Sequence, residues 1–155
     1  MSRIPLVVVV LLSATLAMRA ADPALGTWHL NVAKSKYDPG PPPKSQTRIY
    51  RLEKGEMRAM VITVHKNGNT DTVYYPANYD GKEHPVQGSP DMDGILMKRV
   101  DDSTAESVLT HAGNTIGATR RTVSRDGQTM IITFKGPGEL GQPVNNTAFY
   151  EREKE

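Results

Sequence analysis

The sequence predicts an all-β protein: an up-and-down antiparallel meander of about ten strands (8–10) closed into a barrel. Three observations predict this fold class. Turn dipeptides recur along most of the chain. The segments between them alternate in polarity at a period of two residues, as half-buried strands do. No stretch of helical length shows apolar residues at a 3.6-residue period.

The first 20 residues have the pattern of a secretory signal peptide. Arg3 precedes an apolar stretch at residues 4–12, and mostly small residues follow it. The apolar stretch is too short to span a bilayer. We therefore predict a secreted or periplasmic protein cleaved after Ala20, with cleavage after Ala17 or Ala21, or a retained N-terminal anchor, as alternatives.

Residues 21–155 are predicted to form a single domain with no net charge. Residues 1–20 contain two of the 19 basic residues and no acidic one, so the remaining basic residues balance the 17 acidic ones. This balance argues against a nucleic-acid partner, and no membrane anchor is expected after signal cleavage. The absence of cysteine excludes disulfides, thiolate nucleophiles and Cys-ligated zinc. Oligomeric state stays undetermined.

The strands are delimited by dipeptides that favour the positive φ angles of tight hairpins. These dipeptides are Lys54-Gly55, Asn67-Gly68, Asp80-Gly81, Asp93-Gly94, Asp101-Asp102, Gly113-Asn114 and Asp126-Gly127. The predicted strands are residues 26–32, 44–54, 57–66, 69–79, 83–87, 94–100, 104–111, 115–124, 128–136 and 144–152.

Closure of the sheet removes two exposed edges, so a barrel is preferred over an open or sandwiched sheet. The proline-rich residues 38–43 are expected to form an extended crossing between the first two strands, because proline excludes a helix there. Residues 136–141 are expected to form a longer loop.

A family resemblance rests on motifs spread over the chain from residue 26 onwards. Gly26-Thr27-Trp28 resembles the Gly-x-Trp motif of lipocalins and the Gly-Thr-Trp start of intracellular fatty-acid-binding proteins. The larger set is Gly26-Thr27-Trp28-x-Leu30-Asn31-x-Ala33-Lys34-Ser35-Lys36-Tyr37, Tyr79-Asp80-Gly81-Lys82, Pro85-Val86, Val123-Ser124-x-Asp126-Gly127, and Val144-Asn145-Asn146 before Tyr150. It resembles a group of uncharacterised secreted bacterial lipocalin-like (calycin-type) proteins. The resemblance implies a lipocalin-like barrel and export, and it brings no established ligand.

The two better-known families differ from this chain in informative ways. Fatty-acid-binding proteins carry a two-helix lid where this chain has its proline-rich crossing. They commonly have an Arg-x-Tyr pair for a carboxylate on the last strand, where this chain keeps Tyr150 but has Ala148 in place of the arginine. The lipocalin resemblance also implies that Arg152 stacks on Trp28 in a structural role.

Large side chains spread over most strands are the candidates for a cavity lining, with simple core packing as the alternative for each. They are Tyr50, Met60, Ile62, Tyr74, Met97, Phe134 and Tyr150. Arg99 and Arg121 are candidate polar anchors for an anionic ligand group, or else members of structural ion pairs. Residues 57–65 leave open which strand face points inward, since neither face is wholly apolar.

No metal, cofactor or catalytic site is predicted. The four histidines, at positions 29, 65, 84 and 111, show no ligand spacing, and no Gly-x-Ser-x-Gly motif occurs. The leading hypothesis is a barrel that holds a small apolar or amphipathic molecule in its interior without catalysis. The alternatives are a scaffold with a filled barrel that binds a partner through its loops or outer face, and a barrel enzyme.

Overall fold

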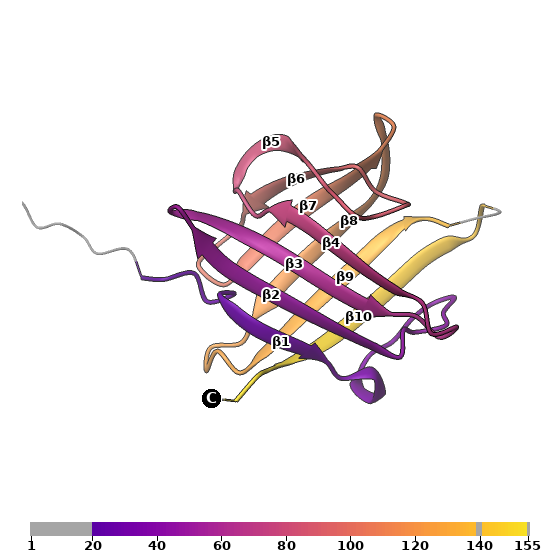
Figure 1. The fold of residues 1–155 in the computed structure, drawn as a ribbon, viewed down its shortest axis with the longest axis horizontal. Coiled ribbons are helices and arrows are strands. Elements are labelled where there is room, and N and C mark those ends of the chain that lie inside the picture. The colour runs from indigo at the N-terminus through magenta and orange to yellow at the C-terminus, as the bar shows by residue number, and fades with distance from the viewer. Residues whose placement is uncertain (1–19, 139–140, 155) are drawn as a thin grey trace, which may run out of the picture.

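A computed structural model describes residues 20–138 and 141–154 as ten antiparallel strands of one sheet, rolled into a nearly closed barrel (Figure 1). The strands are β1 (Gly26–Leu30), β2 (Ser45–Glu53), β3 (Glu56–Val64), β4 (Thr70–Pro76), β5 (Asp80–Pro85), β6 (Gly94–Arg99), β7 (Thr104–His111), β8 (Asn114–Val123), β9 (Thr129–Pro137) and β10 (Pro143–Arg152). The predicted all-β meander is confirmed. The predicted signal peptide lies almost entirely outside the described residues.

Helical structure is nearly absent from the described residues. A single turn of 3-10 helix, η1 (Val32–Lys34), follows β1, and the proline-rich crossing then runs to β2 without a helix. No helix in these parts of the chain is long and apolar enough to cross a membrane.

The barrel closes by pairing of its first and last strands. The gap in the sheet, here called the seam, lies between β4 and β5. The strand order is β4-β3-β2-β1-β10-β9-β8-β7-β6-β5, so β1 pairs with β10, as closure of the meander requires. The two edge strands are the consecutive β4 and β5. Two backbone hydrogen bonds of 2.9 Å join Tyr74 on β4 to Gln87, just after the end of β5. The position of this seam was not predicted, because the turn pattern treats every pair of consecutive strands alike.

The turn dipeptides have two different structural outcomes. Lys54 and Gly55 both have positive φ angles, 52° and 81°, and form the predicted hairpin between β2 and β3. Asp80-Gly81 lies inside β5, where the pairing with β6 shifts register between Asp80 and Glu83. The predicted reversal at this dipeptide is wrong. A glycine with a positive φ, such as Gly81 at 70°, occurs in β-bulges as well as in hairpin turns. The dipeptide alone does not show which of the two structures forms.

One end of the barrel is closed by the chain segment that precedes β1. Trp28 is fully buried, and its indole nitrogen donates a 2.8 Å hydrogen bond to the carbonyl of Ala24. The Arg152 guanidinium lies 4.2 Å from the centre of the Trp28 ring and donates to the carbonyls of Pro23 and Leu25. The structure thus places Arg152 in the stacking position that the lipocalin resemblance implied.

The register decides which strand face points into the barrel. Tyr50, Ala59 and Tyr75 lie directly opposite one another on β2, β3 and β4, and all three are buried. Side chains that face each other across antiparallel strands share a face, so the inner face of β3 carries Ala59 and its alternate neighbours. The small alanine leaves room for the two large tyrosines on either side.

Candidate functional site: the barrel cavity

A cavity of about 200 Å³ occupies the barrel interior. It is lined by Gln46, Arg48, Tyr50, Val61, Thr63, Val73, Tyr75, Met92, Ile95, Met97, Ser107, Leu109, Thr119, Arg121 and Ile132. The apolar part of the lining comes largely from β6, β7 and the loop before β6. The two arginines come from β2 and β8. The interior is therefore neither a dry core nor a uniformly polar one.

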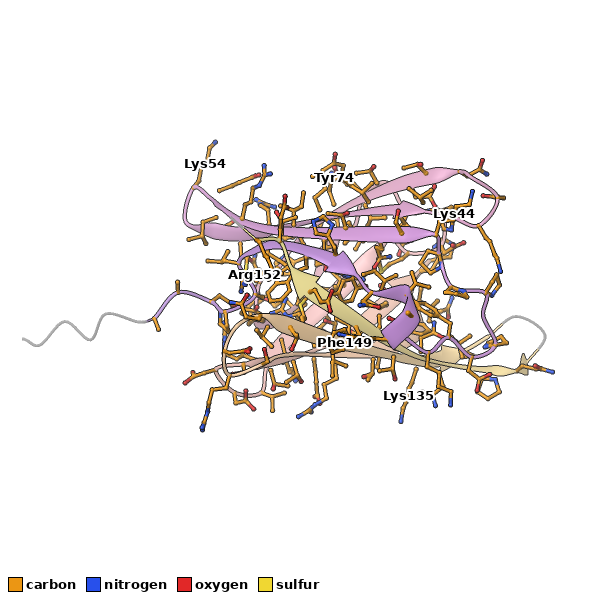
Figure 2. The ribbon with its side chains drawn as sticks, turned by 90° about the horizontal axis from the view of Figure 1, so that it is seen from below. Lys44, Lys54, Tyr74, Lys135, Phe149 and Arg152 are labelled. Carbon is orange, nitrogen blue, oxygen red and sulfur yellow. The ribbon has the colours of Figure 1, made fainter. Side chains whose placement is uncertain are left out.

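The cavity extends toward the end of the barrel where Lys44 lies, opposite the closed end. Figure 2 shows Lys44 and Lys54, which flank β2, near opposite ends of the barrel. A surface groove beside the proline-rich crossing and the β3–β4 hairpin is lined by Pro41, Pro42 and His65. Gln46 and Thr63 line both this groove and the cavity, so the two spaces adjoin at these residues.

Arg121 is the most deeply buried charge of the site, with only 6% of its surface exposed. Its Nη2 donates to the hydroxyl of Tyr79, and its guanidinium carbon lies 4.9 Å from the centre of the Tyr50 ring. Its Nε and Nη1 are buried and have no hydrogen-bond partner among the described residues. Since unpaired buried donors are costly, Arg121 is a charged group with unused binding capacity.

The period-two alternation explains why Arg121, and not its neighbour, enters the barrel. Arg120 is exposed and pairs with Glu106 on the adjacent strand, at 2.5 Å. Adjacent strand residues point to opposite faces, so Arg121 must point inward. The sequence had predicted one inward arginine in this pair.

Arg48 is a second arginine in the cavity lining and was not among the predicted site residues. Its Nε lies 3.0 Å from the Tyr150 hydroxyl and 3.2 Å from Gln46 Oε1, and its Nη1 lies 3.5 Å from the Tyr75 hydroxyl. Tyr50 was a predicted lining residue two positions away on the same strand. Because residues two apart on a strand share a face, an inward Tyr50 also indicates an inward Arg48.

The pKa values of Tyr50 and Tyr75 shift in opposite directions, although both guanidinium groups act to lower each of them. Burial by itself raises the pKa of Tyr50, but the positive charges of Arg48 and Arg121 outweigh it and lower the pKa to about 8. Burial, together with charge on neighbouring Tyr50, raises the pKa of Tyr75 well above its ordinary value. Burial also disfavours the charged form of Arg48, but the neighbouring tyrosines outweigh it and raise its pKa, so Arg48 stays charged.

Arg99 belongs to an ion pair beside the cavity. Its Nη2 donates to the carboxylate of Asp22, whose side chain is only 13% exposed. The Tyr79 hydroxyl donates to the same carboxylate at 2.8 Å, and the Tyr79 ring centre lies 4.3 Å from the Arg99 guanidinium carbon. Burial works to raise the pKa of Asp22, but hydrogen bonds from the Ala24 amide and Tyr79, and then the arginines, lower it. Arg99 therefore has the structural ion pair that was its alternative role.

Tyr50, Met97 and Arg121 line the cavity as predicted in position. Tyr150 is buried inside the barrel, where its hydroxyl contacts Gln46 and Arg48. Phe134 lies on the inner face, opposite Thr119 in the register, and its ring packs on Gly117, where a Cβ atom would lie 2.5 Å from the ring.

Met60, Ile62 and Tyr74 lie on the outer face of the barrel, which corrects their predicted place in the interior. Met60 and Tyr74 are opposite each other on β3 and β4 and line an outer groove of about 320 Å³. Tyr74 is 49% exposed, and Figure 2 shows it at the outer surface. Size and apolarity favoured these residues as lining, whereas the narrow interior accommodates the smaller Ala59 and Val61 on the inner face of β3.

The histidines lie away from the cavity, each near a carboxylate on the outside or at a strand end. The nearest pairs are His65 with Asp71 at 2.6 Å and His84 with Asp80 at 2.8 Å. Within residues 20–138 and 141–154, no three His, Asp or Glu side chains are grouped to hold a metal ion.

Sequence comparisons assign no family to this barrel: the chain matches no protein-family model and no curated protein.

Proposed function

We propose that this protein is a secreted or periplasmic binding protein of lipocalin-like type that holds a small, partly apolar molecule in its barrel without catalysis. The observation that carries the proposal is a barrel interior that contains both a space of about 200 Å³ and a mixed polar and apolar lining. A few polar groups set in an apolar lining are typical of small-molecule sites.

The packing of the barrel supports a binding role over a filled scaffold. Trp28, Tyr50, Met130 and Tyr150 are almost fully buried, and the side chains that close the Trp28 end stabilise the fold. The largest exposed apolar side chains of the described chain, Leu52, Tyr74, Val100 and Ile131, lie outside the cavity lining.

The lining also disfavours the enzyme alternative. A barrel enzyme was expected to bring a histidine and an acid or tyrosine together in the cavity. The lining contains two tyrosines but neither a histidine nor a carboxylate. The remaining hydroxyls, of Thr63, Ser107 and Thr119, have no adjacent base in this lining to activate them.

The test is native mass spectrometry of the protein purified from its own host, followed by solvent extraction and identification of any bound compound. We expect a small molecule in stoichiometric amount that is lost on unfolding and is displaced by competitors. A ligand-free protein that also fails to bind any member of a broad library of small molecules would contradict the binding function and favour the scaffold.

A further inference from the structure

The cavity contains two cationic side chains and no anionic one. Arg48 and Arg121 both line it, and its other lining residues are neutral. Charges removed from water are stabilised by opposite charges or by complete hydrogen bonding. The tyrosines around the two guanidinium groups supply hydroxyls and ring faces but no full negative charge while they are protonated. The lining therefore has an excess of positive charge that an anion would neutralise.

The protein's own nearby carboxylate does not fill this role. Asp22 accepts hydrogen bonds from Arg99, from Tyr79 and from the amide of Ala24, so its oxygens are already engaged. It does not line the cavity. Arg121 reaches this network only through the Tyr79 hydroxyl, and its Nε and Nη1 stay without a partner among the described residues.

The apolar residues of the lining favour an organic anion over an inorganic one. Met92, Ile95, Met97 and Leu109 form an apolar part of the wall, against which a bare inorganic ion would make no favourable contact. A guanidinium is planar and carries several donors, which suits a carboxylate, and it stays charged when buried. The carboxylate would contact the arginines, and the apolar part of the same molecule would pack against this apolar wall.

The volume limits the length of the ligand. The cavity volume is about 200 Å³. This is below the range of pockets that enclose drug-sized molecules. A carboxylate with a short alkyl chain or a single aromatic ring fits inside, whereas a long-chain fatty acid would extend beyond the cavity.

Resting on the proposed function, we infer that the ligand is a small organic carboxylate, with its anionic group bound by Arg121 and Arg48 and its apolar part packed against Met92, Ile95, Met97 and Leu109.

Calorimetric titration of the purified protein with a graded set of probes tests this inference. The protein is first unfolded, dialysed and refolded, so that any host compound is removed. The probes at pH 7 are the straight-chain carboxylates from butyrate to palmitate, hexanol as a neutral partner of hexanoate, and inorganic phosphate as an anion without an apolar part. We expect hexanoate to bind about 10- to 100-fold more tightly than hexanol or phosphate. Affinity should reach its maximum near six to eight carbons.

A pair of adjacent arginines provides a matched control. Arg121→Gln should weaken hexanoate binding by about tenfold or more and leave hexanol binding unchanged, because only the charged contact is lost. Arg120→Gln removes an equal charge from the next residue, on the outer face beside Glu106, and should change neither. Far-ultraviolet circular dichroism and urea unfolding establish that both variants are folded before they are titrated.

The outcomes separate the inference from the function on which it rests. Equal binding of hexanol and hexanoate, tightest binding of palmitate, or equal losses in the two arginine variants would each overturn the small-carboxylate assignment and leave a binding cavity in place. Failure of every carboxylate to bind would also overturn it, and the compound extracted from host-purified protein would then decide the proposed function independently.

Discussion

Half-buried Arg99 on β6 and buried Arg121 on β8 are expected to respond in opposite directions when each is replaced by methionine. Arg99 and Arg121 lie in one cross-strand row, separated only by Ala105 on β7. Arg99 contacts the Asp22 carboxylate directly, whereas Arg121 donates to the Tyr79 hydroxyl and contacts no carboxylate. Their side chains are close in shape and position, so the difference in stability isolates the effect of the partner.

Arg121→Met should stabilise the ligand-free protein. The change removes two unpaired buried donors, each of which costs about 1–3 kcal/mol. It also forfeits the hydrogen bond to Tyr79 and the contact with the face of the Tyr50 ring, together about 2–3 kcal/mol. The expected net gain in the free energy of unfolding is about 1–2 kcal/mol, in the range seen when buried charges are replaced by apolar side chains.

Arg99→Met should destabilise the protein. It leaves the Asp22 carboxylate, 13% exposed, with the hydrogen bonds of Tyr79 and Ala24 and with the charge of Arg121, but with no cation in direct contact. Loss of one partner from a fully buried pair costs about 3–5 kcal/mol, and the 23% exposure of Arg99 reduces this to about 2–3 kcal/mol.

Urea unfolding of refolded, ligand-free protein, followed by the fluorescence of Trp28, measures both changes. Trp28 is the single tryptophan of the chain and is fully buried against Arg152, so its emission reports the loss of the barrel. Equal slopes of free energy against urea concentration are required for the comparison. If Arg121→Met destabilises the protein as much as Arg99→Met, then Arg121 is a structural residue, and the argument that it is held ready for an anion fails.

Three further predictions concern the barrel itself. Tyrosine absorbance at 295 nm should show one phenol that ionises near pH 8, and Tyr50→Phe should remove this step. An unchanged absorbance titration in the variant would assign this step to another tyrosine. Because the pKa of Tyr50 lies below the unfolded value of about 10, its contribution to stability should grow as pH rises from 8 to 10 and be lost as pH falls through 8. Gly26→Ala should cost about 1–3 kcal/mol in urea unfolding, because φ is 123° and the added Cβ would lie 2.5 Å from Arg152 Nη1; a neutral result would show that the chain relaxes freely there. Met130→Ala should cost about 2–5 kcal/mol and Met60→Ala less than about 1 kcal/mol, since the first is fully buried and the second lies on the outer face; equal costs would contradict the assigned strand face.

The strands were predictable because their signals are local. A hairpin such as that at Lys54-Gly55 is encoded by a dipeptide with positive φ and by the alternation on either side of it. The ten predicted strands match those of the structure to within a few residues at most ends. At Asp80-Gly81 the dipeptide correctly indicated a positive φ, but the result is a bulge inside β5 and not a reversal of the chain. The local signal is the same for both structures.

The candidate site was predictable only in part, because the cavity depends on which face of each strand points inward. Because adjacent strand residues point to opposite faces, one of Arg120 and Arg121 had to point inward, and Tyr50, Met97 and Tyr150 were found from their size and apolarity. The same criterion misplaced Met60, whose outward position follows from the fit of Ala59 between two tyrosines on neighbouring strands.

The sequence by itself determined the strands, the tight hairpins and the neutral, cysteine-free character of residues 21–155, since these depend on composition and on neighbours along the chain. Only the tertiary structure decided that the seam lies between β4 and β5, that Arg48 joins Arg121 in the cavity, and that Asp22 neutralises Arg99. These are contacts between residues far apart in the sequence. They depend on the register of the strands and on which side chains fit together inside a narrow barrel. The small Ala59, for example, fits between Tyr50 and Tyr75 on the inner face.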